Sequence, residues 1–165
     1  MKNYIGIIFY KIENNKTFFL LKQNNLVILN QDSDIYSDFG LNTENIDDVI
    51  NLFVDNTFNL SYDYNEIINM PKKYFKNEKY NYSIYFINSD IDKDKIYTIN
   101  KLINYFNKNF LLEDNKFIKY KKENYISQDS IKWFELNEIL NNQNKFSKFF
   151  FNTFLKSIKE KIIII

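Results

Sequence analysis

The residues with the clearest potential for chemistry are the acidic side chains between Ser37 and Leu60. Apolar residues recur at helical spacing in this stretch, which predicts an amphipathic helix with an acidic outer face. The residues on that outer face are Asp47, Asp48, Asn51, Asp55 and Asn56. Because carboxylate oxygens are the ligands that hard divalent cations prefer, this face is a candidate metal site. The alternative is an ordinary helix whose carboxylates lie in solvent, which is the commoner arrangement.

The start of this helix is marked by its sequence. Gly40 provides a turn, Asn45 is a suitable N-cap, and Asp48 at the third helical position opposes the helix dipole. The face predicted to pack against a core carries Ile46, Val49, Ile50, Phe53 and Thr57. The sequence therefore predicts a helix that buries one stripe and exposes its acidic side.

A second stretch, from Lys72 to Tyr80, alternates lysines with aromatic rings. The lysines are Lys72, Lys73, Lys76 and Lys79, and the rings are Tyr74, Phe75 and Tyr80. Cations beside rings suit a nucleotide or an RNA strand, whose phosphates and bases they contact. The alternative is the edge of a hairpin that lysines protect from aggregation.

Other features of the composition exclude whole classes of chemistry. The chain has no His and no Cys, so it has no imidazole base, thiolate nucleophile or disulfide. It also lacks Arg, so Lys or backbone amides must meet any phosphate. The net charge of +1 argues against a general nucleic-acid binder. Asp90, Asp92 and Asp94 are spaced like calcium ligands but lack the glycine and the later glutamate of a calcium loop.

The elements that must position these residues fit a single domain spanning residues 1–165. A chain of this length buries roughly 70% of its surface and needs no disulfide or metal to fold. No stretch resembles a secretory signal or approaches the roughly 20 apolar residues of a membrane span. We therefore expect an intracellular protein with no membrane partner.

Hydrophobic patterning predicts strands at Tyr4–Ile12, Thr17–Lys22, Leu26–Leu29, Tyr82–Asn88, Phe117–Tyr120 and Ser130–Leu136. Tyr4–Ile12 is a nearly continuous apolar run, typical of a central strand covered on both faces, and residues 13–16 supply a hairpin turn. Further helices are predicted at Ile96–Phe110 and Lys145–Lys161, with a helical turn at Asn137–Leu140. We expect loops at Ser61–Asn65 and Asp90–Lys95, and the last four isoleucines either dock or fray.

This order of elements resembles the Nudix family, and particularly the Nudix-domain proteins encoded by giant DNA viruses. The resemblance rests on Ser37–Gly40 before the helix, Asp55–Leu60 at its end, and Ser130–Leu136 with its Trp-Phe-Glu-Leu ending. It implies an α/β/α sandwich around a mixed sheet. It also implies hydrolysis of nucleoside diphosphates linked to another group, including mRNA caps, with magnesium or manganese held by helix glutamates. For a viral protein, it places the chain in the infected cell's cytoplasm or in the virion.

The Nudix box itself is degenerate in this chain. Aligned on its C-terminal half, the box places Asn51 at its arginine and Leu52, Asp55 and Asn56 at its three glutamates. The resemblance then leaves Asp48 and Asp55 as metal ligands, with Glu44 nearest to a further expected glutamate. It also suggests Glu123 as the distal carboxylate that activates water. We therefore expect a protein of Nudix descent that is impaired or inactive in pyrophosphate hydrolysis.

Three functions remain open at this point. The first is an active hydrolase that uses Asp48 and Asp55 with magnesium or manganese. The second is a nucleotide-binding or cap-binding module that does not hydrolyse its ligand. Its base would stack between the rings of Tyr74, Tyr80 and Trp133, beside Lys73. The third is a scaffold whose aromatic surface contacts a protein partner.

Overall fold

The structure is a computed structural model that describes residues 3–24, 35–111 and 128–163. Three predictions therefore lie outside the described residues: the strands at Leu26–Leu29 and Phe117–Tyr120, and the position of Glu123. Within the described residues, seven strands form one mixed sheet. The strands are β1 (Tyr4–Glu13), β2 (Lys16–Asn24), β3 (Tyr36–Ser37), β4 (Phe39–Asn42), β5 (Lys72–Asn77), β6 (Tyr82–Asn88) and β7 (Gln128–Glu135).

The central position of β1 confirms the prediction from its apolar run. It pairs with β6 in parallel and with β2 and β4 in antiparallel, and Ile5 to Tyr10 are buried. The sheet order is β3-β2-β1-β6-β5, with β4 added to β1 and β7 added to β2. A strand that is paired at both edges and covered on both faces has no side-chain position that faces solvent. This explains why its residues are almost all apolar.

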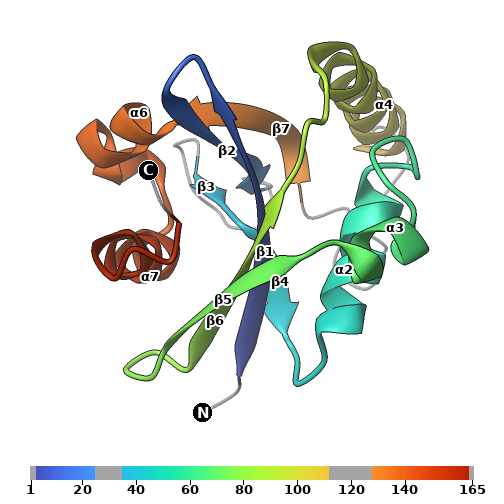
Figure 1. Cartoon of the computed structure of the whole chain (residues 1–165). Coiled ribbons are helices and arrows are strands. Elements are labelled where there is room, and N and C mark those ends of the chain that lie inside the picture. The colour runs from blue at the N-terminus through green and yellow to red at the C-terminus, as the bar shows by residue number, and fades with distance from the viewer. Residues whose placement is uncertain (1–2, 25–34, 112–127, 164–165) are drawn as a thin grey trace.

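The sheet opens into a fork on one side of β1. The β1–β2 hairpin turns at Asn14 and Asn15, whose φ angles of 52° and 59° suit a tight hairpin turn. Further from this turn the two strands diverge. Residues 36–37 run back along β2, and residues 39–42 then run out along β1 (Figure 1). Asp38 therefore occupies the vertex where the chain reverses inside the fork.

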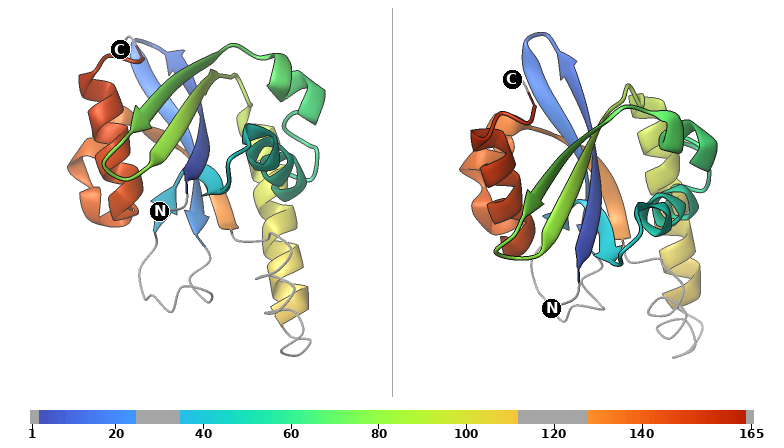
Figure 2. Two further views of the ribbon diagram at one scale, coloured as in Figure 1. Left: turned by 90° about the horizontal axis from the view of Figure 1, so that it is seen from below. Right: turned by 60° about the horizontal axis from the view of Figure 1, so that its bottom comes forward.

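Helices cover both faces of this sheet. On one face lie α2 (Ile46–Asn56), α3 (Tyr64–Asn69) and α4 (Lys93–Leu111), and on the other lie α6 (Leu136–Asn141) and α7 (Lys148–Lys159). Figure 2 shows the two helical layers on opposite sides of the strands. Each layer has its own apolar core, with Phe53 and Ile99 in one and Phe150 and Phe154 in the other. This architecture confirms the predicted α/β class and its α/β/α layering.

The helix α2 forms where its sequence predicts, but Gly40 lies within β4 rather than in a turn, and Asn56, expected on the outer face, is buried. Asn45 caps it by accepting a hydrogen bond from the backbone N–H of Asp47 at 2.9 Å. Val49, Ile50 and Phe53 are fully buried, and the ring of Phe53 lies 4.6 Å from that of Phe9 on β1. The predicted stripe is thus the face that packs on the sheet.

The helix α3 replaces part of a segment that was predicted to be loop. Asp63 and Glu66 form a complete capping box, in which each side chain accepts a hydrogen bond from the other residue's backbone N–H. This Asp-x-x-Glu spacing is a recognised helix start that the apolar pattern did not emphasise. A six-residue helix has too few turns to show clear periodicity, so only its cap could have revealed it.

The helix α4 begins at Lys93, inside the predicted loop Asp90–Lys95. The Asp92 carboxylate accepts a hydrogen bond from the backbone N–H of Lys95 at 2.7 Å, which caps the helix. Asp90 accepts one from the Tyr62 hydroxyl at 3.2 Å. Two of the three aspartates with calcium-like spacing therefore stabilise local structure.

The C-terminal elements follow the prediction with shifted boundaries. The helix α7 starts at Lys148, after a 3-10 turn at Gln143–Lys145, so the predicted start at Lys145 is early. Phe150 and Phe154 are buried, but Phe149 is 58% exposed. Ile163 is buried, so the described end of the chain docks on the protein.

Candidate functional site

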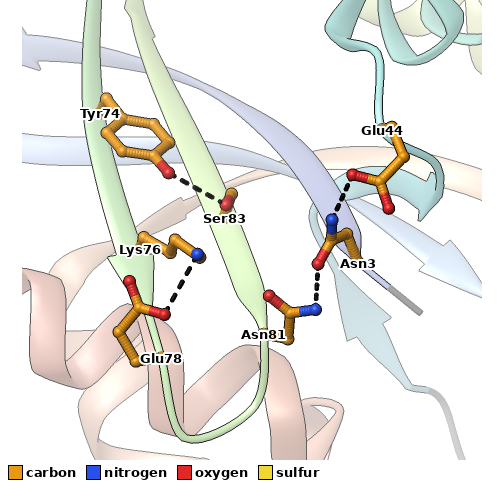
Figure 3. Close-up of polar contacts among 7 residues, drawn as sticks. All are labelled: Asn3, Glu44, Tyr74, Lys76, Glu78, Asn81 and Ser83. Atoms are coloured by element: carbon orange, nitrogen blue, oxygen red, sulfur yellow. Dashed lines mark hydrogen bonds and ion pairs between the residues drawn. The ribbon is translucent and has the colours of Figure 1, made fainter. Parts of the chain in front are cut away.

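The sheet face beside α2 and α3 carries a polar and aromatic surface on the β5–β6 hairpin. We call this surface the tyrosine face, and it consists of Tyr74, Lys76, Ser83 and Tyr85. Tyr74 lies opposite Tyr85 and Lys76 lies opposite Ser83 in the strand register. Alternation along a strand places these four side chains on one face. Figure 3 shows three of them, Tyr74, Lys76 and Ser83, together on the hairpin.

The two tyrosines of this face form a ring pair that remains accessible. Their ring centroids are 4.9 Å apart with planes tilted by 47°, and Tyr74 is 47% exposed. The Tyr74 hydroxyl lies 3.3 Å from that of Ser83. Burial raises the pKa of Tyr85. Both geometry and exposure therefore leave a ring surface on which a flat ligand can stack.

Lys76 supplies the positive charge of the tyrosine face. Its ammonium lies 3.1 Å from the Glu78 carboxylate, which raises its pKa, with smaller contributions from Tyr74 and Glu44. The ion pair is exposed, and such pairs contribute only about 0–1 kcal/mol. A phosphate can therefore displace Glu78 from Lys76 at small cost.

A chain of side-chain amides borders this surface. The Asn81 amide donates to the Asn3 side-chain oxygen, and the Asn3 amide donates to the Glu44 carboxylate (Figure 3). We call this chain the asparagine bridge. It joins the start of β6, the start of β1 and the loop between β4 and α2. Glu44, which was predicted from the Nudix resemblance, is thereby held at the rim of the tyrosine face.

The four lysines of residues 72–79 have separate roles. The Lys72 ammonium donates to the carbonyl oxygens of Ile67, Ile68 and Met70 at 2.6 to 2.9 Å, so its three donors are used at the end of α3. Partial burial lowers the pKa of Lys72, opposed by Asp47. Lys73 falls on the opposite face of β5, and the Lys79 ammonium lies 5.4 Å from the centre of the Tyr80 ring. Lys72 and Lys76 both share a face with Tyr74, and because the Lys72 ammonium is bound to the end of α3, Lys76 is the one placed to contact a ligand.

The structure does not bring the predicted base-stacking residues together. Tyr80 packs on the other face of the sheet, where its ring centroid is 5.5 Å from that of Phe149. Trp133 lies on β7, which β2, β1 and β6 separate from β5. Its indole N–H donates to the Ile91 carbonyl oxygen at 3.3 Å, and the Lys11 ammonium lies 5.1 Å from its ring. Only Tyr74 of the three predicted rings belongs to the tyrosine face.

The predicted metal ligands are also dispersed. The Asp48 carboxylate accepts a hydrogen bond from the Thr43 hydroxyl at 2.5 Å, and Asp55 is exposed two helical turns further on. Seven residues of helix span about 10 Å, whereas two oxygens bound to one magnesium ion lie about 3 Å apart. Among the described residues, no group of three or more acidic side chains could hold a metal ion. The described side chains therefore do not fit the family's metal cluster, while Glu123 lies outside them.

The sequence pattern placed Lys73 rather than Lys76 beside the ligand, because residues 72–80 were treated as one cluster, and it did not indicate Tyr85 on the neighbouring strand. Period-two alternation in 72–77 and 82–88 would have separated the two faces and paired the correct lysine with Tyr74. The asparagine bridge had no sequence signal, because asparagine is common throughout the chain.

The fold and this surface together define an α/β/α sandwich with an open, tyrosine-bearing sheet face. Comparison with models of protein families, with curated proteins and with solved structures gave no match to this chain. In the part of the chain that the structure describes, no helix is both long and apolar enough to cross a membrane.

Proposed function

We propose that this protein is a binding module of Nudix descent that holds a nucleoside phosphate on the tyrosine face without hydrolysing it. The observation that carries the proposal is the Tyr74–Tyr85 ring pair, in which Tyr74 is exposed and Tyr85 is partly buried, with Lys76 at the next position on the same face. A base stacks on aromatic rings irrespective of its identity, and an ammonium meets a phosphate as a point charge. The Nudix ancestry itself is supported by the α/β/α layering and by the sequence motifs.

The alternative is a magnesium-dependent or manganese-dependent hydrolase that uses Asp48 and Asp55. The dispersed positions of these two carboxylates favour binding over turnover. The ligand class is shared by both functions, so the experiment must measure binding and hydrolysis separately. A protein partner is the third function, and it would leave both measurements blank.

We expect isothermal titration calorimetry to detect nucleoside diphosphates or a cap analogue binding to the full chain. Because stacking on one aromatic side chain contributes about 1–3 kcal/mol, Tyr74→Ala should weaken binding at least about fivefold. Lys76→Gln should weaken binding of phosphorylated ligands by about tenfold, and that of the free nucleoside very little. Calorimetry is preferable to tryptophan fluorescence because Trp133 is three strands away from the site.

Lys73→Gln is the matched control, because it removes the same charge from the same strand on the opposite face. It should change the dissociation constant by less than about twofold. Equal losses in Lys73→Gln and Lys76→Gln would contradict the assigned site. Binding that persists in EDTA, with no product formed in manganese, supports the module. Product formation that Asp55→Asn abolishes would instead establish the hydrolase.

A further inference from the structure

Asp38 is a buried carboxylate that the proposed binding site does not use. It lies at the vertex between β3 and β4, where the chain reverses in the fork of the sheet, and it is fully buried. Its Oδ1 accepts hydrogen bonds from the hydroxyls of Tyr82 at 2.7 Å and Tyr4 at 3.3 Å. Its Oδ2 has no hydrogen-bond partner among the described residues. Burying a carboxylate with hydrogen bonds to only one of its oxygens lowers the free energy of unfolding, so the presence of Asp38 requires an explanation.

The backbone around Asp38 is built to admit this side chain. A Cβ atom on Gly6 would lie 1.6 Å from Oδ2, so the carboxylate rests directly against the Cα of Gly6. A Cβ on Gly40 would lie 2.6 Å from the Tyr4 ring. Gly6 and Gly40 are the only glycines of the chain and are paired across β1 and β4. Both therefore make room for Asp38 or for a tyrosine that contacts it.

The two hydroxyl contacts differ in a way that depends on the charge of Asp38. A hydroxyl that donates to an ionised carboxylate lies at about 2.5–2.7 Å, which Tyr82 satisfies and Tyr4 does not. Ionisation of Asp38 should therefore draw the Tyr4 hydroxyl closer, and protonation should release it. Burial and the carboxylate hold the pKa of both tyrosines well above its usual range, so both remain donors.

The same two tyrosines adjoin the asparagine bridge. Tyr4 follows Asn3, Tyr82 follows Asn81, and Tyr4 and Tyr82 are paired in the parallel register of β1 and β6. Successive side chains of a strand point to opposite faces. The tyrosines therefore contact Asp38 on one face while the asparagines connect to Glu44 on the other. A movement of Tyr4 or Tyr82 that shifts the backbone of its strand therefore also displaces the adjoining asparagine.

We propose that Asp38 is a proton-linked switch that acts through Tyr4 and Tyr82 on the asparagine bridge and so sets the position of Glu44. Burial raises the pKa of Asp38 to about 6, opposed in turn by Tyr82, Lys22 and Tyr4. Among the described residues, the charged group that faces the Asp38 carboxylate is the Lys22 ammonium on β2. The titratable groups that face it are the hydroxyls of Tyr4 on β1 and Tyr82 on β6. The coupling of Asp38 to the asparagine bridge requires no ligand, whereas its effect on ligand affinity rests on the proposed function.

Nuclear magnetic resonance on the labelled full chain between pH 4.5 and 8 tests this coupling without any ligand. We expect the side-chain carboxyl carbon of Asp38 to titrate with a midpoint near 6. The side-chain amide signals of Asn3 and Asn81 should shift with the same midpoint. Amide signals that stay constant through the Asp38 titration would overturn the proposal, whatever the outcome of the ligand measurements.

Two variants separate Asp38 from the titration of Glu44 itself. Asp38→Asn should abolish the shared midpoint, and amide shifts that persist in it would overturn the proposal. Lys22→Met keeps Asp38 but removes the nearby cation, so the carboxyl and amide midpoints should rise together by at least about half a pH unit. A rise of the carboxyl midpoint alone would also overturn it. Glu44→Gln, the control, should leave the Asp38 midpoint in place.

Discussion

At the scale of single residues, the two glycines show how a neighbouring side chain can leave room for glycine alone. Neither Gly6 nor Gly40 has a positive φ angle, so neither is needed for its backbone conformation. Each is needed for space, since a Cβ would contact Asp38 at one position and Tyr4 at the other. The polar cluster of Asp38, Tyr4, Tyr82 and Lys22 therefore depends on residues that have no side chain.

We expect Gly6→Ala to lower the free energy of unfolding by about 3 kcal/mol, because the added methyl overlaps the Asp38 carboxylate. Urea unfolding of the two proteins measures this difference. Truncation of the carboxylate in the Gly6→Ala, Asp38→Ala double variant should recover part of the loss. Losses that simply add in the double variant would show that the methyl destabilises the sheet for another reason.

At the scale of elements, the protection of sheet edges explains several polar side chains. The edge of β7 is covered by Asn100 of α4, whose amide donates to the Ile131 carbonyl at 2.8 Å and accepts from its N–H at 2.8 Å. This side chain thus satisfies the backbone as a neighbouring strand would. At the opposite edge lies β5, which carries Lys72, Lys73 and Lys76, so the lysine-rich stretch does occupy a sheet edge.

We expect Asn100→Ala to lower the free energy of unfolding by about 1–3 kcal/mol, because it leaves a buried strand residue with two unpaired backbone groups. It should also promote association, since a free edge can pair with another chain. Thermal unfolding and light scattering measure the two effects. Asn104→Ala, an exposed position one turn further along α4, should leave both unchanged.

At the scale of the whole molecule, the stability of the sandwich should depend on the charge of its buried acid. The pKa of Asp38 is raised from 3.8 to about 6 in the folded protein, so folding favours its protonated form. The stabilising contribution is complete below about pH 4 and is lost as the pH rises through 6. The difference between the two values corresponds to about 3 kcal/mol.

We therefore expect the free energy of unfolding to fall by up to about 3 kcal/mol between pH 4 and pH 8 through Asp38 alone. Urea unfolding of the wild type and Asp38→Asn at matched pH values isolates this contribution, because the exposed carboxylates are common to both. The wild type should lose more stability than the variant as the pH rises. Parallel curves for the two proteins would show that folding does not raise the pKa of Asp38.

Strong local signals accounted for most of the fold. Three elements have a signal that lies within their own residues: the apolar run of β1, the alternation of β6, and the N-cap and apolar stripe of α2. These elements were therefore predicted within a few residues of their observed bounds. The short helix α3 was missed because it depends on a cap. Of the predicted site residues, Tyr74 and Glu44 lie at the tyrosine face, whereas Lys73, Tyr80 and Trp133 do not.

The sequence by itself determined the α/β class, the central strand and the amphipathic helix, because periodicity and capping act between residues that are close in the chain. Only the tertiary structure decided that Tyr74 pairs with Tyr85, that Glu44 meets Asn3, and that Asp38 is buried at a vertex between two glycines. These contacts depend on strand register and on which face of the sheet each side chain occupies. A change of one residue in register reverses that face, and no local pattern in the sequence reports it.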